Sequence, residues 1–328
     1  MGEAVLSVDN LKTYFRVKEG LAKAVDGVSF QIHRGETLGL VGESGCGKTV
    51  SSLSILKLLE MPPAEFHSGN ILFEGQDLLT FSEQQMRNLR GKSISMIFQE
   101  PMTSLNPMLS IGFQVGEVLV NHEGLTTRQA RARTIELLEM VGIPSPEKRI
   151  TEYPHQLSGG MRQRVMIALA LACNPKVLIA DEPTTALDVT IQAQILELMM
   201  DLRENLGTSI LLITHDLGVI AETAHRVAVM YAGKIVEESD VATIFKNPLH
   251  PYTQGLMKSI PRIDESGSTR RLAEVPGMVP NLYNLPPGCS FFDRCSVGIE
   301  KCRATNAKLV AVDGDHSVRC WVAQDGWS

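Results

Sequence analysis

The sequence predicts an α/β fold with a mostly parallel sheet covered by helices, followed by a small irregular region. Short apolar runs typical of buried strands alternate with helical segments of ten or more residues. A Gly-rich turn at 42–49 lies between one such strand and a helix. Repeated prolines then break the last third of the chain into short pieces. We therefore expect one large domain at 1–240 and a separate C-terminal extension at 241–328.

The N-terminal part predicts strands and one helix around the Gly-rich turn. Residues 6–15 and 27–32 are expected to be strands. Residues 37–41 are apolar and Gly-punctuated, as in a buried strand that precedes a Gly-rich loop. The helix after the loop is expected at 49–59, because Met61-Pro62-Pro63 then stops it.

The middle of the chain predicts a helical insertion within the α/β core. A short strand at 94–98 precedes it, and apolar residues at helix spacing continue through 134–141. We expect this helical subdomain at about 100–157. The core then resumes with helices at 160–173 and 189–205 and strands at 177–180 and 209–214.

Composition argues against some classes of protein without excluding them. A net charge of −6 and a pI near 5.8 provide no basic field that would favour nucleic acid. The longest apolar run, 165–173, falls short of the roughly 18 residues that a membrane-spanning helix requires. The N-terminus shows no export signal. We expect a cytoplasmic protein that reaches a membrane only through partners.

The Gly-rich turn matches G-x-x-x-x-G-K-[ST], the phosphate loop that binds a nucleoside triphosphate. Its glycines permit the backbone to turn N–H groups toward phosphate oxygens, and the next helix adds its positive end. Lys48 is expected to contact the β- and γ-phosphates, and the Thr49 hydroxyl to bind Mg²⁺. The predicted nucleotide-binding residues of this loop are Gly42, Glu43, Ser44, Gly45, Cys46, Gly47, Lys48, Thr49 and Val50.

Polar side chains at strand ends are the candidate catalytic groups. Asp181 and Glu182 follow the strand at 177–180, so Asp181 is expected to bind Mg²⁺ and Glu182 to act as general base toward water. Gln99 follows another strand and is expected to contact Mg²⁺ and the attacking water. His215 follows a third strand, where its imidazole can bond the γ-phosphate.

These motifs, with Leu157-Ser158-Gly159-Gly160 and Ala186-Leu187-Asp188, occur in the order found in ATP-binding-cassette (ABC) ATPases. The chain resembles that family over about residues 5–240. The resemblance implies an ABC-type P-loop domain with a RecA-like parallel core, an antiparallel β subdomain and a helical subdomain. It also implies a head-to-tail dimer, in which Ser158, Gly159 and Gly160 of one subunit close over ATP on the other. The residue that stacks on adenine would be Phe15 or Tyr14, and spacing favours Phe15.

The C-terminal region is similar to that of the oligopeptide and dipeptide importer ATPases. The similarity lies in 247–253, in Pro287-Gly288-Cys289 and in the segment 99–107. It implies a second ATPase subunit, identical or related, and two membrane permease subunits at the cytoplasmic face of the membrane. An extracytoplasmic peptide-binding protein would take part indirectly, and no nucleic acid would bind.

Four cysteines gather near the C-terminus with the spacing C-x₅-C-x₆-C-x₁₇-C: Cys289, Cys295, Cys302 and Cys320. Four thiolates can hold zinc or a 4Fe–4S cluster. Structural zinc sites usually use C-x₂₋₄-C, so the longer spacings favour the cluster. Members of the peptide-importer group carry a 4Fe–4S cluster on such cysteines. Zinc and ordinary free thiols are the alternatives, and His316 is a further candidate ligand.

We therefore expect an ATPase subunit that couples ATP hydrolysis to uptake of dipeptides or oligopeptides. An importer for a related solute such as a nickel chelate is the alternative, since this subunit does not touch the cargo. A soluble ABC ATPase acting on nucleic acid or ribosomes is disfavoured by the single cassette and the net charge. A redox- or metal-sensing protein would require the cysteines to lie near the nucleotide, and nothing in the sequence places them there.

Overall fold

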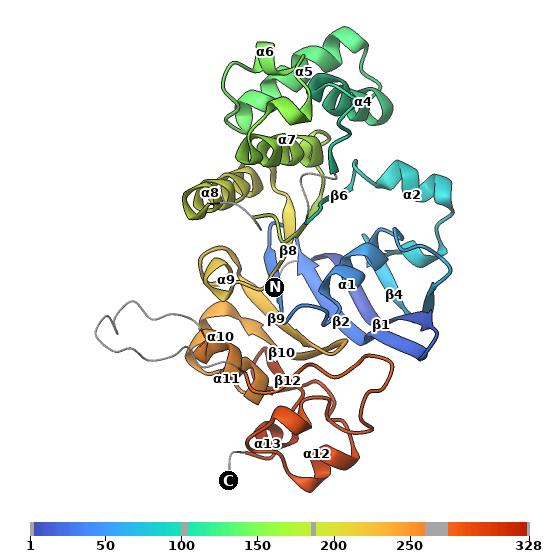
Figure 1. Ribbon diagram of the computed structural model, residues 1–328, viewed down its shortest axis with the longest axis vertical. Helices are drawn as coiled ribbons and strands as arrows, with labels where there is room; N and C mark the ends of the chain where they lie inside the picture. Colours follow the sequence, from blue (N-terminus) through green and yellow to red (C-terminus); the bar gives the residue numbers. More distant parts are fainter. Residues whose placement is uncertain (1–2, 100–103, 185–187, 260–274, 327–328) are drawn as a thin grey trace, which may run out of the picture. The chain divides into compact units, whose positions relative to one another are not determined.

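The computed structural model describes residues 3–99, 104–184, 188–259 and 275–326 (Figure 1). The chain forms two compact units that interleave in sequence. The helical unit comprises Met1–Leu6, Ile32–Glu36 and Phe73–Ile213, and the phosphate-loop unit comprises Ser7–Gln31, Thr37–Leu72 and Thr214–Ser328.

The phosphate-loop unit contains a mixed sheet with strands in the order β11-β12-β10-β9-β3. Parallel pairing joins β3 to β9, with Leu38 opposite Arg226, whereas β9, β10, β12 and β11 pair antiparallel. The bounds are β3 Thr37–Val41, β9 Arg226–Tyr231, β10 Lys234–Asp240, β11 Val310–Asp313 and β12 His316–Val318. Every residue of β3 is buried, as its apolar sequence predicts.

A second sheet and several helices complete this unit. Long strands β1 (Ala4–Val17) and β2 (Gly20–His33) belong mostly to it, and β1 lies between β2 and β4 (Ala64–Phe73). The helices are α1 Lys48–Ile55, α9 Leu217–Thr223, α10 Val241–Lys246, α11 Pro251–Lys258, α12 Glu300–Ala304 and α13 Trp321–Gln324, with a 3₁₀ turn, η4, at Phe292–Arg294.

The helical unit contains three parallel strands in the order β8-β7-β6: β8 Ser209–Thr214, β7 Val177–Asp181 and β6 Ile94–Ile97. All residues of β7 and β8 are buried, so these strands are covered on both faces of the sheet, as their continuous apolar runs predict. Helix α8, Val189–Leu206, connects β7 to β8 along the chain and ends at Gly207, whose φ of 68° lies in the left-handed region.

Helices α4, α5 and α7 also belong to the helical unit and contact one another (Figure 1). Helix α4 (Ile111–Glu123) begins after Ser110, whose side chain accepts the Phe113 N–H. A capping box formed by Thr126 and Gln129 begins α5 (Thr127–Met140). The remaining elements are α2 Glu83–Leu89, α6 Pro146–Arg149, α7 Gly159–Leu171, the pair β5 Gln76–Asp77, η1 Leu78–Thr80 and η2 Pro154–Gln156.

Two expectations from the sequence differ from the structure. The helix expected at 49–59 ends at Ile55, because Lys57 adopts a φ of 50° and the chain leaves the helix before the prolines. The C-terminal region adds strands to the sheet, since β12 pairs with β10 through Glu237 and Val318. The predicted domain boundary at residue 240 stays a prediction. Within the part of the chain that the structure describes, no helix has both the length and the apolar character needed to cross a membrane.

Candidate nucleotide-binding site

Two glycines of the phosphate loop lie against backbone that leaves no room for a side chain. A Cβ on Gly42 would lie 2.2 Å from the Met230 carbonyl oxygen. One on Gly47, whose φ is 111°, would lie 2.2 Å from the Ala24 carbonyl oxygen. The loop therefore follows β9 closely, and only glycine fits at these two positions.

The Lys48 side chain is held inside its own loop. It is 5% exposed, and its Nζ donates to the carbonyl oxygens of Gly42 at 2.6 Å and Glu43 at 3.1 Å. Helix α1 begins here after Gly47, which provides no side-chain cap. The first N–H groups of the helix have no intrahelical partners and can bind phosphate oxygens, while Thr49 is exposed at the same end. These features suit a triphosphate.

Glu43 makes contacts outside the loop that the sequence did not reveal. Its carboxylate accepts two hydrogen bonds from the Arg294 guanidinium, at 2.7 and 2.8 Å. Its backbone N–H donates to the Tyr252 hydroxyl at 2.8 Å. Tyr252 lies in the segment 247–253, for which the sequence indicated family membership and no chemistry. No local sequence pattern predicts the contact between Arg294 and Glu43, which lie 251 positions apart along the chain.

The two aromatic candidates for adenine stacking lie in different environments. Tyr14 is 5% exposed, stacks on His67, and donates its hydroxyl proton to Asp26 at 2.7 Å. Burial and the Asp26 carboxylate raise the pKa of Tyr14 well above its usual value. Tyr14 is thus part of the internal packing, whereas Phe15 is only half-buried. That Phe15 stacks on adenine stays a prediction.

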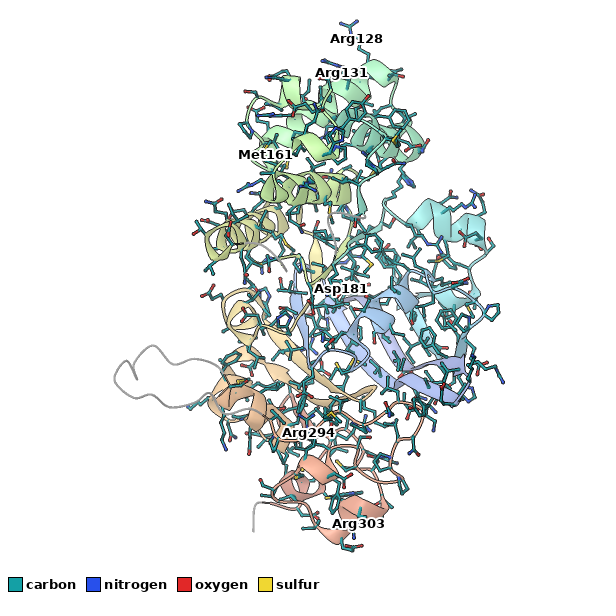
Figure 2. The ribbon with its side chains drawn as sticks, in the orientation of Figure 1. Arg128, Arg131, Met161, Asp181, Arg294 and Arg303 are labelled. Atoms are coloured by element: carbon teal, nitrogen blue, oxygen red, sulfur yellow. The ribbon has the colours of Figure 1, made fainter. Side chains whose placement is uncertain are left out.

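The helical unit brings together Gln99 and Glu182, two of the predicted catalytic residues. Asp181 is 1% exposed at the end of β7 (Figure 2), and Glu182 follows it with a φ of 47°. The Glu182 N–H bonds the Ile213 carbonyl oxygen at 2.8 Å, and its Oε2 accepts from the Gln99 amide at 3.1 Å. A non-glycine residue in left-handed conformation is strained, and such residues concentrate at functional sites.

The signature segment begins α7. Ser158 is its N-cap, and the Ser158 hydroxyl accepts the Met161 N–H at 3.3 Å. A Cβ on Gly160 would lie 3.0 Å from a methyl of Ile191, whereas Gly159 faces open space. Ser158 and Gly159 are exposed, so the N-terminal end of this helix can receive an anion from outside the subunit.

The remaining motif residues are His215, the residues 186–188 and the segment 99–107. His215 is exposed directly after β8, and the next residue, Asp216, caps α9 by accepting the Gly218 N–H at 2.8 Å. Asp188 is the N-cap of α8. Ala186, Leu187 and residues 100–103 of the segment 99–107 lie outside the described residues. The assigned roles of these residues stay predictions.

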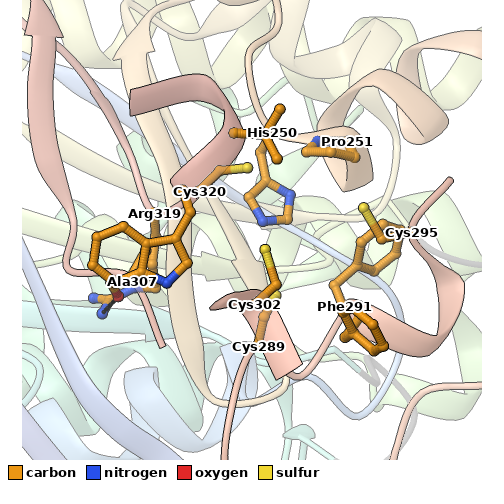
Figure 3. A pocket seen from close by; sticks show the side chains of 12 residues that line it. His250, Pro251, Cys289, Phe291, Cys295, Cys302, Ala307, Arg319 and Cys320 are labelled. Carbon is orange, nitrogen blue, oxygen red and sulfur yellow. Dashed lines mark hydrogen bonds between the residues drawn. The ribbon is translucent and has the colours of Figure 1, made fainter. Parts of the chain in front are cut away.

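All four C-terminal cysteines line one small cavity together with His250 and Phe291 (Figure 3). None is in a disulfide. Burial raises the pKa of the Cys289 thiol to about 11, and also raises the pKa values of Cys295 and Cys320. Among the described residues, no group of three or more His, Cys, Asp or Glu side chains is arranged to hold a metal ion. The predicted metal or cluster site is therefore not supported by a coordination geometry.

A buried carboxylate joins this region to the sheet. Glu237 on β10 is 0% exposed, and its oxygens accept the N–H groups of Leu249 at 2.7 Å and His250 at 2.8 Å. Its Oε1 also contacts His316 Nε2 at 2.8 Å. His316 is therefore bound to Glu237 and is not among the residues that line the cysteine cavity. The imidazole beside the cysteines belongs to His250, whose pKa burial lowers to about 4.

Comparison with solved structures identifies the fold. A bacterial ABC transporter cassette solved as a dimer matches with a TM-score of 0.65 and 27% identity, covering 72% of this chain and 98% of that one. The same cassette in a post-hydrolysis state with ADP and phosphate matches equally. CbiO1 from Clostridium perfringens, part of an ABC transporter complex, matches with a TM-score of 0.63 and 29% identity, covering 75% of this chain and 92% of that one.

Sequence comparison gives the same assignment over the whole chain. Residues 25–185 match the ABC transporter family model, and residues 236–302 match the oligopeptide/dipeptide transporter C-terminal region. The oligopeptide transport ATP-binding protein AppD of Bacillus subtilis is 54% identical over 98% of this chain and 97% of its own length. The dipeptide transport ATP-binding protein DppD of the same organism is 50% identical over 98% and 95%. The chain belongs to the ABC transporter ATP-binding proteins, in the oligopeptide/dipeptide transporter group.

Proposed function

We propose that this protein hydrolyses ATP to drive the import of dipeptides or oligopeptides through separate membrane subunits at the cytoplasmic face of a membrane. The observation that carries this proposal is full-length similarity to oligopeptide and dipeptide transport ATP-binding proteins, at 54% and 50% identity respectively. The phosphate loop, the strand-end carboxylates and the exposed signature helix are the parts such an ATPase requires.

Glu182 is the proposed general base. Its hydrogen bond to Gln99 orients the carboxylate, and an oriented carboxylate can accept a proton from the water that attacks the γ-phosphate. Thr49, Gln99 and Asp181 offer hydroxyl, amide and carboxylate oxygens, the donor set that Mg²⁺ prefers. Bound Mg²⁺ would neutralise phosphate charge. Lys48, already directed into the loop, would exchange its carbonyl partners for phosphate oxygens.

A dimer would complete the nucleotide site. Ser158, Gly159 and Gly160 at the start of α7 are proposed to bind the γ-phosphate of ATP held by a partner ATPase subunit, identical or related. The exposure of Ser158 and Gly159 supports this role. A solved relative is dimeric, which agrees with such an assembly.

A groove on the helical unit is the proposed contact for the permease subunits. Its volume is about 610 Å³, and its walls come from α4, α5 and the segment 150–153. Phe113, Val120 and Tyr153 line it and are 53%, 40% and 40% exposed, so together they give the groove an exposed apolar wall. Arg131, in the N-terminal half of α5 (Figure 2), also lines the groove and adds a polar edge. An apolar groove with a polar edge fits a short amphipathic helix of a membrane subunit.

We also propose that the four C-terminal cysteines hold a 4Fe–4S cluster, with zinc as the second candidate. Four free thiols line the same cavity. Burial raises the pKa values of Cys289, Cys295 and Cys320, and a bound cation would stabilise their thiolates. A cluster bound there would supply a structural cross-link among the four segments that carry the thiols.

Substitution of Glu182 tests the catalytic assignment. Glu182→Gln retains a side chain that can accept from Gln99 but cannot accept a proton, so phosphate release is expected to fall by at least about 100-fold. MgATP binding and ATP-dependent dimerisation are expected to persist, measured by calorimetry and light scattering. Glu197→Gln, at an exposed position of α8, is the matched control and should hydrolyse ATP like the parent. Near-parental turnover of Glu182→Gln would remove Glu182 from the role of base.

A further inference from the structure

The C-terminal region contacts the phosphate loop directly through Glu43. We define the Glu43 contacts as the ion pair from Arg294 to the Glu43 carboxylate and the hydrogen bond from the Glu43 N–H to the Tyr252 hydroxyl. Both partners come from residues after β10, and Glu43 is the second residue of the loop.

Arg294 occupies a single, fully bonded position. Its side chain is 5% exposed, and it donates to Glu43 through both terminal nitrogens. Its Nε donates to the Pro276 carbonyl oxygen at 2.7 Å, and one terminal nitrogen also donates to Val275 at 3.1 Å. The other reaches the Tyr231 hydroxyl at 3.3 Å. A planar guanidinium bonded on all sides fixes the carboxylate that it faces in both distance and orientation.

Tyr252 is fixed as well. It is 0% exposed, and its ring lies 4.7 Å from that of Tyr231 and 5.5 Å from that of Phe291, centroid to centroid. Its hydroxyl therefore presents an acceptor to the Glu43 N–H from a rigid aromatic cluster. Both the backbone and the side chain of Glu43 are thus held from outside the loop.

The position of Glu43 in turn determines that of Lys48. The Glu43 carbonyl oxygen accepts from Lys48 Nζ at 3.1 Å and from the Cys46 N–H at 3.3 Å. A shift of Glu43 would move the acceptor that holds the lysine and would alter the turn that presents the next N–H groups. A phosphate loop binds tightly only when these donors are already arranged, because ordering them on binding costs affinity.

The segment that carries Arg294 also carries two of the cavity cysteines. Arg294 lies in η4, between Cys289 and Cys295, and Phe291 of the same segment both lines the cysteine cavity and packs on Tyr252. The arrangement that the cysteines adopt is therefore coupled, through one short segment, to the residue that holds Glu43.

We propose that Arg294 and Tyr252 are positioning residues for the phosphate loop, so that the C-terminal region of this protein sets its affinity for ATP. The proposal rests on the nucleotide site proposed above. Neither residue belongs to the phosphate-loop motif at 42–49. They act through Glu43, which keeps Lys48 and the loop N–H groups in the arrangement that receives the phosphates.

Calorimetric titration of the full-length chain with MgATP tests this proposal. Glu43→Gln keeps the shape of the side chain but removes the charge that pairs with Arg294, and is expected to raise the Kd on the order of tenfold, a typical coupling between sites. Arg294→Gln should do the same, and Tyr252→Phe should raise the Kd by less. Glu65→Gln is the matched control, because the Glu65 side chain is exposed to a similar degree as that of Glu43, 32% against 27%, and its ion pair with Arg16 lies off the loop. Tyr283→Phe is the control for loss of a hydroxyl. Both should bind like the parent.

The double variant separates positioning from general loss of structure. If Arg294 acts through Glu43, then Glu43→Gln with Arg294→Gln binds MgATP no more weakly than either single variant. In the assembled importer, the Glu43 and Arg294 variants should have a raised KM for ATP and a kcat within about twofold of the parent. This is expected because the lost binding energy contributes equally to the ground state and the transition state. A Kd for Glu43→Gln within about twofold of the parent, or multiplicative effects in the double variant, would overturn the proposal. Lys48→Ala must lose MgATP binding; if it does not, the nucleotide site itself is misassigned.

Discussion

Asp26 connects three parts of the phosphate-loop unit through one carboxylate. Tyr14 of β1 donates to its Oδ1 at 2.7 Å, and Lys234 of β10 pairs with its Oδ2 and also bonds its carbonyl oxygen at 3.0 Å. Burial alone would raise the pKa of Asp26, but the hydrogen bonds and charge from Lys234 and Tyr14 outweigh burial and lower this pKa below its usual value. The ionised form therefore stabilises the folded state.

This stabilisation should depend on pH. The folded-state pKa of Asp26 lies below the unfolded value of about 3.9, so its contribution is fully present above pH 5 and is lost as pH falls below about 4. Asp26→Asn should lower the free energy of unfolding at pH 7 by about 1.5 kcal/mol, and the gap from the parent should narrow at pH 3.5. Urea titrations at both pH values check this, with Asp9→Asn on exposed β1 surface as control. A gap that does not narrow would contradict it.

Helix α4 shows how two glycines four residues apart differ. A Cβ on Gly112 would lie 2.2 Å from Ile150 Cγ1 and 2.6 Å from the Ile150 carbonyl oxygen, whereas one on Gly116 would meet nothing closer than 3.8 Å. Gly112 thus lets the helix approach the segment at 150, and the Gly112 N–H bonds the same carbonyl at 2.9 Å. Gly116 sits in ordinary helical surroundings.

Alanine at these two positions should have opposite effects. Gly112→Ala forces α4 away from Ile150 and should destabilise the protein by about 1–3 kcal/mol. Gly116→Ala adds helix propensity without a clash and should stabilise it by about 0.5–1 kcal/mol. Midpoints of urea unfolding measure both changes. Equal effects of the two substitutions would show that the approach of α4 to Ile150 is not what Gly112 provides.

Elements with strong local signals were predictable from the sequence. The strands at 37–41 and 209–214 have the observed bounds, because continuous apolar runs in a parallel sheet are buried on both faces. The end of α1 was misplaced by four residues, since Lys57 enters the left-handed region without a glycine to announce it. Motif residues such as Lys48 and Ser158 also stand where their motifs place them, at helix starts.

Contacts between residues distant along the chain were not predictable. Arg294 and Tyr252 are ordinary residue types in an irregular region, and Glu43 lies 251 and 209 positions before them. Only the folded chain brings them together, so no sequence pattern relates the cysteine region to the nucleotide site. The cysteine spacing did indicate a shared location, and the four thiols line one cavity.

At the scale of the whole molecule, metal content decides what the cysteines do. Anaerobically purified protein should contain iron and sulfide near four per chain, with broad visible absorbance. The Cys302→Ser variant should lose most of this iron. The Cys173→Ser variant should keep it, because Cys173 does not line the cavity. Stoichiometric zinc, or no metal in the parent protein, would reject the cluster.

The pairing of β12 with β10 has a consequence for how this protein can be divided. Removing the residues after β10 would open the edge of that strand. It would also remove Leu249, His250 and His316, which bond the Glu237 carboxylate from the C-terminal region. A charged group buried without donors is strongly destabilising. The cassette and its C-terminal region therefore depend on each other to fold. A chimera that takes its C-terminal region from a relative must also take that relative's β10 sequence.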